Sequence, residues 1–215
     1  MEKVRQLKPD IIVFTGDLVD SEKYNEKTSL ALMKELLSIA SVYYVTGNHE
    51  WWSGNFETLE KKLQDTGVVV MRNLHAVIQK GDDKIQLLGV DDPAIADGDS
   101  KEELVEREIQ SAMKGVEKKE KFTVLLSHRP ELLSLYERYK MDLVLSGHAH
   151  GGQVRFPFIG GLVAPDQGFL PKYTAGKYKK GDTTMIVNRG LGNSIIPQRL
   201  FDRPEIVEVT LAAGE

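Results

Sequence analysis

Short apolar runs that end in a small residue and then a polar one recur through this chain, and they limit its fold more than any other feature. Four of them are "DIIVFTGD", "SVYYVTGNH", "FTVLLSH" and "DLVLSGH". Each has the continuous apolar character of a strand that is buried on both faces. Segments with a helical pattern lie between them, such as residues 21–39 and 55–67, with Asn55 as a predicted cap and Gly67 as a predicted stop. The alternation predicts an α/β fold in which residues 1–215 form one domain.

The remaining segments predict a mixed sheet system. "GVVVMRN", "HAVIQ" and "KIQLLGV" lie close together with turn residues between them, so we expect antiparallel strands. Ser100 and Glu103 form a capping-box pattern in front of a helix that reaches about Lys118, and Pro130 starts a further helix. The last third is rich in Gly and Pro and ends in two predicted strands, "TTMIVNRG" and "EIVEVTL".

The composition excludes several classes of function. The formal net charge of -4 argues against a nucleic-acid-binding protein with a basic surface. Cysteine is absent, which excludes disulfides, thiolate zinc sites and a cysteine nucleophile, so any metal must be held by nitrogen and oxygen atoms. The start "MEKVRQLKPD" has the pattern of neither a signal peptide nor a membrane span. We therefore expect a cytoplasmic protein, with membrane association in a longer form.

Polar side chains follow each of the four apolar runs at the point where the predicted strand ends. Four of the chain's five histidines lie at these ends. Open α/β sheets place their ligand sites at the carboxyl ends of strands. The candidate site residues there are Asp17, Asn48, His49, His128, His148 and His150.

These side chains indicate a transition-metal site. Oxygen and imidazole ligands together suit Mn, Fe, Zn or Co rather than Mg or Ca alone. His148 and His150, at positions i and i+2, would share one side of an extended segment. Two alternatives remain, namely that Asn48 only tolerates a left-handed turn and that His128 is an ordinary structural histidine. We favour the metal site because all of these residues lie together at strand ends.

The segments "TGDLVD", "GNHE", "SH" and "GHAHGGQ" resemble the calcineurin-like metallophosphoesterases, in the order and approximate spacing of that family. "SGHAHGGQVRFP", "APDQGFLPKY" and "NRGLGNSIIPQR" are similar to a bacterial subgroup of phosphohydrolases. The resemblance implies an α/β/β/α sandwich with mixed sheets and two divalent transition-metal ions at the strand ends.

Carried over to this sequence, the resemblance implies that Asp17 bridges both metals and that His150 ligates the first. The ligands that would complete the second metal site are Asn48, His128 and His148. His49 would stay off the metals and approach the substrate phosphate, while Asp20 would hydrogen-bond His49 and hold its orientation. Asp20 has an alternative interpretation as a helix cap, since Ser21 follows it at a predicted helix start.

The reaction implied by this site is hydrolysis of a phosphomonoester or phosphodiester. A hydroxide that bridges the two metals would attack phosphorus in line. His49, as an imidazolium, would stabilise the developing charge or protonate the leaving oxygen.

One part of the family pattern is missing. The family opens with an Asp-x-His motif at the end of its first strand, which supplies two ligands to the first metal, and this chain contains no Asp-x-His. We therefore expect a fold that lacks the usual first strand, in a chain truncated at its N-terminus relative to the family, unless another segment or a partner chain fills the gap. The first metal would keep only Asp17 and His150, fewer ligands than usual. The alternative function is a catalytically impaired fragment or pseudoenzyme that binds a partner or one metal.

The sequence indicates a phosphate-ester substrate without identifying it. Arg189 or Arg199 could bind a substrate phosphate, or could be packing arginines. "FPFIGGLVAP" could line a lipid-facing groove or belong to the core. Four residues near the motifs have both structural and functional interpretations: Asp91 and Asp92, for which we favour a structural turn, and Trp51 and Trp52, which could line the site or simply pack.

Overall fold

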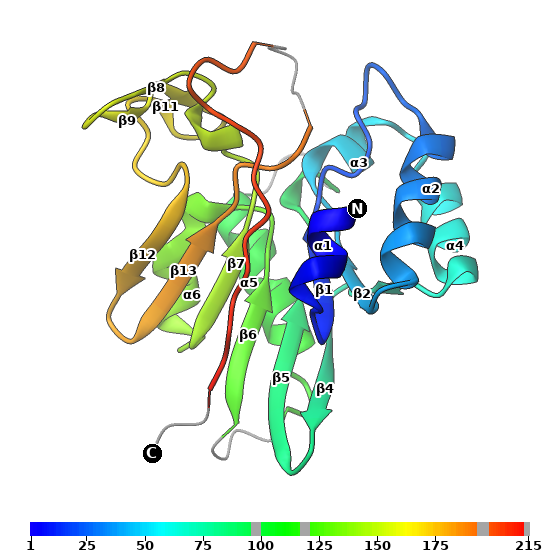
Figure 1. The fold of residues 1–215 in the computed structure, drawn as a ribbon. Helices are drawn as coiled ribbons and strands as arrows, with labels where there is room; N and C mark the ends of the chain where they lie inside the picture. The colour runs from blue at the N-terminus through cyan, green and yellow to red at the C-terminus, as the bar shows by residue number, and fades with distance from the viewer. Residues whose placement is uncertain (96–99, 117–120, 193–197, 213–215) are drawn as a thin grey trace.

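The described chain forms two main β-sheets, each accompanied by its own helices, and two short two-stranded pairs (Figure 1). The computed structural model describes residues 1–95, 100–116, 121–192 and 198–212. The smaller sheet has three parallel strands in sequence order, namely β1 (Ile11–Thr15), β2 (Ser41–Val45) and β3 (Val69–Val70).

The larger sheet is mixed. Its six strands lie in the order β12 (Gly176–Lys180), β13 (Thr183–Val187), β7 (Leu143–Ser146), β6 (Phe122–Leu126), β5 (Asp83–Gly89) and β4 (Leu74–Lys80). The four inner strands are parallel to one another, and the two edge strands β12 and β4 are antiparallel to their neighbours. The parallel inner strands have their carboxyl ends at one edge of the sheet.

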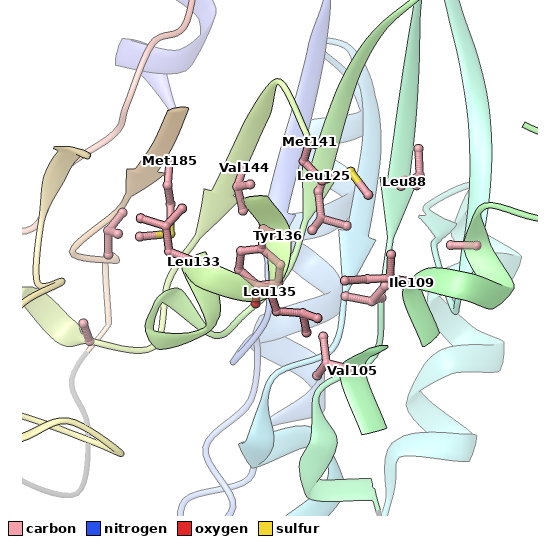
Figure 2. Close-up of a cluster of buried hydrophobic side chains, with 14 of the residues drawn as sticks. Leu88, Val105, Ile109, Leu125, Leu133, Leu135, Tyr136, Met141, Val144 and Met185 are labelled. Carbon is pink, nitrogen blue, oxygen red and sulfur yellow. The ribbon is translucent and has the colours of Figure 1, made fainter. Parts of the chain in front are cut away.

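Helices pack on the outer face of each sheet. α2 (Glu26–Leu37) and α4 (Phe56–Thr66) bury Met33, Leu59 and Leu63 against Val42 and Tyr44 of β2. On the larger sheet, α5 (Lys101–Ala112) and α6 (Leu133–Arg138) form a second cluster with strand residues, which Figure 2 shows.

A third cluster lies between the two sheets. It joins Val45, which ends β2, to Leu87, Val124 and Leu126 of the larger sheet. Side chains alternate between the faces of a strand, and Leu125 accordingly lies in the helix-facing cluster. The layers are therefore helix, sheet, sheet and helix, which confirms the predicted α/β/β/α sandwich.

Short elements complete the described chain. They are the helices α1 (Glu2–Leu7) and α3 (Asn48–Trp52), the 3₁₀ turns η1 (Pro93–Ile95), η2 (Pro130–Leu132) and η3 (His150–Gly152), and the small strands β8 (Arg155–Phe156), β9 (Gly160–Gly161), β10 (Val163–Ala164) and β11 (Gly168–Phe169). β8 pairs with β9 and β10 with β11, each antiparallel, and they project beyond the larger sheet at the upper left of Figure 1. No helix in the described ranges is long and apolar enough to cross a membrane.

Several predicted boundaries and pairings are wrong. The helix predicted over residues 21–39 starts only at Glu26, where Asn25 accepts a hydrogen bond from the Thr28 N–H at 3.1 Å. β3 pairs in parallel with β2, whereas β4 and β5 form the predicted antiparallel pair. The helix that Ser100 caps ends at Ala112, and Lys118 lies outside the described residues.

The last predicted strand, "EIVEVTL", is not a strand in the described chain. Its alternating pattern is suited to a sheet, but pairing needs a neighbouring strand edge. Val207 and Val209 remain 37% exposed. The alternation is therefore present without the partner that would turn it into a sheet strand.

β1 lies at an edge of the smaller sheet. It pairs with β2, and the described residues add no strand on its other side. All five of its residues are partly exposed, although the segment is continuously apolar. Within the described residues β1 is therefore an edge strand, and the absence of the family's first strand stays a prediction.

Candidate metal centre

Four strand ends bring the predicted ligands to one place. Asp17 follows β1, His128 follows β6, and His148 follows β7. Asp17 and His148 have positive φ values of 55° and 61°, so the chain turns sharply as it leaves each strand. Asn48 is the first residue of α3 and is not among the residues with positive φ, so its alternative interpretation as a left-handed turn residue is wrong.

The side chains of these four residues converge on one point. Nε2 of His128 lies 3.2 Å from Oδ1 of Asn48 and 3.2 Å from Oδ2 of Asp17. Nδ1 of His148 lies 3.0 Å from the same Nε2. The carboxylate and the two imidazoles place one ligand atom each within 4.8 Å of one another. The structure therefore brings together the predicted ligands Asp17, Asn48, His128 and His148.

Hydrogen bonding around the centre favours lone pairs that face inward. Nδ1 of His128 lies 2.7 Å from the carbonyl oxygen of Thr15, which can only accept, so Nδ1 carries a proton and the neutral ring presents its Nε2 lone pair. Oδ2 of Asp17 is buried and accepts no hydrogen bond in the described chain. A buried acceptor without a donor is costly unless a cation or proton lies beside it. The residues present therefore fit a bound cation.

The ionisable groups of the centre also favour a bound cation. Burial raises the pKa of Asp17, but the neighbouring His128, His49 and His148 outweigh burial and hold that pKa well below its usual range. Burial lowers the pKa of His128, yet Asp17 raises it to about 9. The centre consequently stabilises one positive charge, which a proton or a metal ion can supply.

His150 lies apart from this group. Within the described ranges, His150 belongs to neither cluster of three ligand atoms. Burial lowers the pKa of His150 to about 4, so its imidazole is neutral and able to ligate. The predicted first metal site therefore has only Asp17 and His150 among its predicted ligands.

A second cluster of possible ligands contains Glu131, His148 and Asp166. The guanidinium of Arg129 already lies inside it. Nη1 of Arg129 contacts Oδ2 of Asp166 and lies 2.8 Å from Nε2 of His148 and 3.8 Å from Glu131. This cluster is therefore an ion-pair network around an arginine.

His49 lies beside the centre, but Asp20, its predicted partner, does not contact it. The N–H of Ser21 donates to Nδ1 of His49 at 3.1 Å, and the Ser21 hydroxyl lies 3.0 Å from the same atom. Asp20 instead accepts hydrogen bonds from the N–H groups of Glu22 and Lys23. The predicted contact between Asp20 and His49 is thus replaced by one from Ser21, and Asp20 caps a local turn.

Glu50 is a structural part of the site that the sequence reading missed. It is completely buried, and its two oxygens accept hydrogen bonds from the N–H groups of Gly47, Asp17, Leu18 and Val19 at 2.6 to 3.2 Å. Burial, with Asp17 adding to it, raises the pKa of Glu50 to about 7 against the opposing effect of these donors. The Glu50 carboxylate therefore links the "TGD" turn to the "TGNHE" turn through hydrogen bonds. Its signal was the acidic residue three positions after Gly47, as in a capping box.

Arg129 and its partners are the other missed part. Arg129 is 1% exposed and holds Asp92 through contacts of 2.5 and 2.8 Å. Asp91 pairs with Arg72 at 2.9 Å and accepts the hydroxyl hydrogen bond of Thr46 at 3.0 Å. Asp91 and Asp92 thus have the structural roles that we favoured.

The remaining candidates contact the chain's own groups. Arg199 donates to the carbonyl oxygens of Arg189 and Gly192, and Arg189 lies 3.4 Å from Glu205. Trp52 is 57% exposed, with its ring 5.4 Å from that of His49. Trp51 instead packs on Phe56, at 4.8 Å between ring centroids. Of the four, Trp52 lies against a predicted site residue and remains open to solvent.

Comparison with known proteins shows the family. Residues 1–152 match the family model described as calcineurin-like phosphoesterase. The chain is 31% identical over 211 residues to the uncharacterized metallophosphoesterase YkuE of Bacillus subtilis, covering 97% of this chain and 70% of the relative. It is 33% identical to an uncharacterized metallophosphoesterase of Aquifex aeolicus, covering 95% of this chain and 73% of that protein.

Other relatives and solved structures extend the likeness. The Bos taurus transmembrane protein with metallophosphoesterase domain is 32% identical, and the match covers 98% of this chain but 48% of that protein. The chain thus spans about half the length of some curated relatives. Haemophilus influenzae NAD nucleotidase (NadN) shares the fold with a TM-score of 0.52 at 14% identity, over 87% of this chain and 42% of that one. With the family model and the sequence relatives in agreement, the chain belongs to the calcineurin-like phosphoesterase family.

Proposed function

We propose that this protein hydrolyses a phosphate ester with the help of a divalent transition-metal ion. The observation that carries the proposal is the convergence of four acceptor atoms, from Asp17, Asn48, His128 and His148, on one point, where a buried carboxylate oxygen accepts no hydrogen bond from the described residues. Nitrogen and oxygen donors of this kind suit Mn, Fe, Zn or Co. When bound, such an ion supplies Lewis acidity to phosphoryl oxygens and to an attacking water.

The four residues would hold the ion from four different strand ends. Their positions are fixed by groups that do not bind it, namely the Thr15 carbonyl behind His128 and the Glu50 carboxylate beneath the Asp17 turn. Fixed donors matter because catalysis depends on polar groups that are in place before the transition state forms. Asp17 also interacts electrostatically with His150, so Asp17 could ligate a second ion, as the family resemblance implies.

His49 would act as a neutral hydrogen-bond donor. Because the Ser21 N–H points at Nδ1, a proton on Nδ1 would set two N–H groups against each other. The ring therefore keeps its proton on Nε2, where it can donate to a phosphoryl or leaving oxygen. This replaces the imidazolium that we expected from the sequence.

Hydrolysis of artificial esters tests the proposal. We expect the chain, loaded with manganese, to hydrolyse bis(4-nitrophenyl) phosphate or 4-nitrophenyl phosphate, and we expect Asp17→Asn to remove that activity. Asp142→Asn makes the same chemical change at the start of β7, away from the centre, and serves as the control. Wild-type protein that binds manganese but hydrolyses neither ester would argue for the second candidate function.

That second candidate is a metal-binding protein without catalysis. The observation in its favour is that Asp17, His128 and His148 place ligand atoms within 4.8 Å of one another, whereas His150 belongs to no such cluster among the described residues. Phosphatases that use two metals clamp both the attacking and the leaving oxygen, and one ion alone would give a weaker catalyst.

We also propose that the projecting hairpins contact a membrane. Phe158 and Phe169 of the hairpins are 109% and 69% exposed, and Phe201, which lines one pocket with Phe156 of β8, is 82% exposed. Apolar side chains that gather on one surface mark an interaction site. Residues 153–204 contain eight Lys or Arg and three Asp or Glu, in a chain whose net charge is -4. Apolar tips on a basic segment suit an anionic lipid surface. Relatives named as transmembrane proteins are consistent with a location of this protein at a membrane surface.

Sedimentation with vesicles tests the membrane contact. We expect binding to vesicles that contain phosphatidylserine, weakened by Phe158→Ser and left unchanged by Leu74→Ser, which removes an apolar side chain that is 56% exposed on β4. Equal binding by both variants, or self-association without vesicles that Phe158→Ser abolishes, would refute the membrane assignment.

A further inference from the structure

The segment "APDQGFLPKY" supplies a residue that touches the centre and that the predicted site does not use. Asp166 lies in the turn between β10 and β11, with its backbone at φ 57°. Its Oδ2 lies 3.1 Å from Nε2 of His148. Nδ1 of the same ring faces His128 in the centre. Asp166 therefore lies behind a proposed metal ligand, on the side opposite the metal.

The two nitrogens of the His148 ring have opposite requirements. To bind a cation, Nδ1 must present a lone pair, so the neutral ring must carry its proton on Nε2. That N–H is buried and needs an acceptor. Asp166 Oδ2 is the acceptor to which the described hydrogen bonds connect it.

Arg129 works against this arrangement. Its Nη1 lies 2.8 Å from Nε2 of His148, and a guanidinium can only donate. If Arg129 were the only neighbour of Nε2, this nitrogen would keep its lone pair and accept a hydrogen bond from Nη1. The ring proton would then lie on Nδ1 and block the atom that must bind the metal. The negative charge of Asp166 beside both groups reverses that preference, because it accepts from Arg129 and from His148 on the same oxygen.

Asp166 is itself held in position. Lys101 at the start of α5 contacts Oδ1, and Arg129 contacts Oδ2 while its other nitrogens bind Asp92. The carboxylate is thus fixed from both sides before any ligand arrives. Carboxylates that receive the second N–H of a ligating histidine commonly raise metal affinity by 10- to 100-fold.

We infer that Asp166 is a positioning residue that selects the His148 tautomer with the proton on Nε2 and so keeps Nδ1 free for a metal ion. This rests on the proposed metal site. It assigns to the β10–β11 turn a role in assembling the centre, and it makes metal affinity depend on a residue that does not touch the metal.

Two substitutions test the inference. Asp166→Ala removes the acceptor, and Asp166→Asn keeps a residue type that tolerates positive φ, so that the turn still folds. We expect the dissociation constant for Zn²⁺, measured by competition with a chromophoric chelator, to rise about 10-fold or more in Asp166→Ala and by a smaller factor in Asp166→Asn. Asp142→Asn, a carboxylate that accepts the Thr123 N–H, should bind Zn²⁺ like wild type.

Long-range ¹H–¹⁵N correlation spectra of the five histidines provide a readout that a purely structural role would not change. Since Nε2 of His128 faces Nδ1 of His148 at 3.0 Å in metal-free protein, we expect the fraction of His148 that carries its proton on Nε2 to be larger in wild type than in Asp166→Ala. A lower melting temperature with unchanged tautomer and unchanged Zn²⁺ affinity would overturn the inference while leaving the metal site intact. Wild-type protein that binds no Zn²⁺ would instead overturn the proposed function, and the inference with it.

Discussion

Replacing Arg129 with Met should destabilise the fold far more than removing an exposed arginine. Arg129 is 1% exposed, and its partner Asp92 has a side chain that is 0% exposed. Two contacts of 2.5 and 2.8 Å join them, in the fork geometry that lysine cannot reproduce. The substitution leaves the Asp92 carboxylate buried, and among the described residues the Ala94 N–H remains as its hydrogen-bond donor at 2.8 Å.

The expected magnitude follows from that uncompensated charge. Removing one partner of a buried ion pair costs about 3–5 kcal/mol. Since a domain is stable by only about 5–15 kcal/mol, Arg129→Met should remove about a fifth or more of the free energy of unfolding. Adding Asp92→Asn removes the charge but keeps an oxygen for the Ala94 N–H, so the double variant should recover about 2 kcal/mol.

Urea unfolding at pH 7 measures these differences. Arg138→Met is the matched control, because Arg138 pairs with Glu102 at a similar 2.8 Å but its side chain is 50% exposed. Exposed ion pairs contribute little to stability, so this variant should unfold nearly like wild type. If Arg129→Met cost no more than Arg138→Met, or if Asp92→Asn brought no recovery, the network would not have the energetic role that we assign to it.

Three further predictions concern buried groups around the centre. Burial, with Asp91 and Asp92 adding to it, raises the pKa of Glu108 to about 8. Between pH 4.5 and 8 the folded state therefore holds a proton that the unfolded state has lost, so the free energy of unfolding falls as pH rises through this range. Glu108→Gln should therefore gain about 3 kcal/mol relative to wild type between pH 5 and pH 8 in urea unfolding, and a constant difference would contradict the pKa shift. Glu50→Gln should loosen the Asp17 turn and weaken manganese binding, which calorimetric titration can measure, and affinity equal to wild type would show that the turn needs no anchor. His49→Gln should lower the hydrolysis rate roughly 100-fold or more while leaving the metal content unchanged, and an unchanged rate would remove His49 from the reaction.

Much of the architecture could be predicted because it depends on local patterns. Apolar runs such as residues 122–126 and 143–146 are parallel neighbouring strands in the structure, so their carboxyl ends lie at one edge of the larger sheet. The Asn55 and Gly67 boundaries of α4 also agree with the prediction. The strand pattern of residues 205–211 failed for the opposite reason, since a strand needs a partner that the pattern itself cannot supply.

The set of metal ligands could be predicted for the same reason, but the contacts that hold these ligands in position could not. Asp17 and Asn48 follow parallel neighbours in the smaller sheet, and His128 and His148 follow parallel neighbours in the larger one, so each pair was expected at one sheet edge. The packing of the two sheets then brings the two pairs together. Asp166 reaches His148 from a Gly- and Pro-rich turn with no periodic pattern. Ser21 contacts His49 because the chain bends before α2 begins, whereas Asp20 uses its carboxylate on that bend. Such contacts depend on turn geometry, which residue type alone does not determine.

Metal stoichiometry tests the central claim most directly. Wild-type protein and Asp17→Asn would be loaded with manganese, freed of excess metal by gel filtration and measured by elemental analysis. The four converging atoms predict one ion per wild-type chain, and Asp17→Asn should lose it. Wild-type protein that retains no manganese, or Asp17→Asn that retains as much as wild type, would contradict the assignment of these residues as a metal centre.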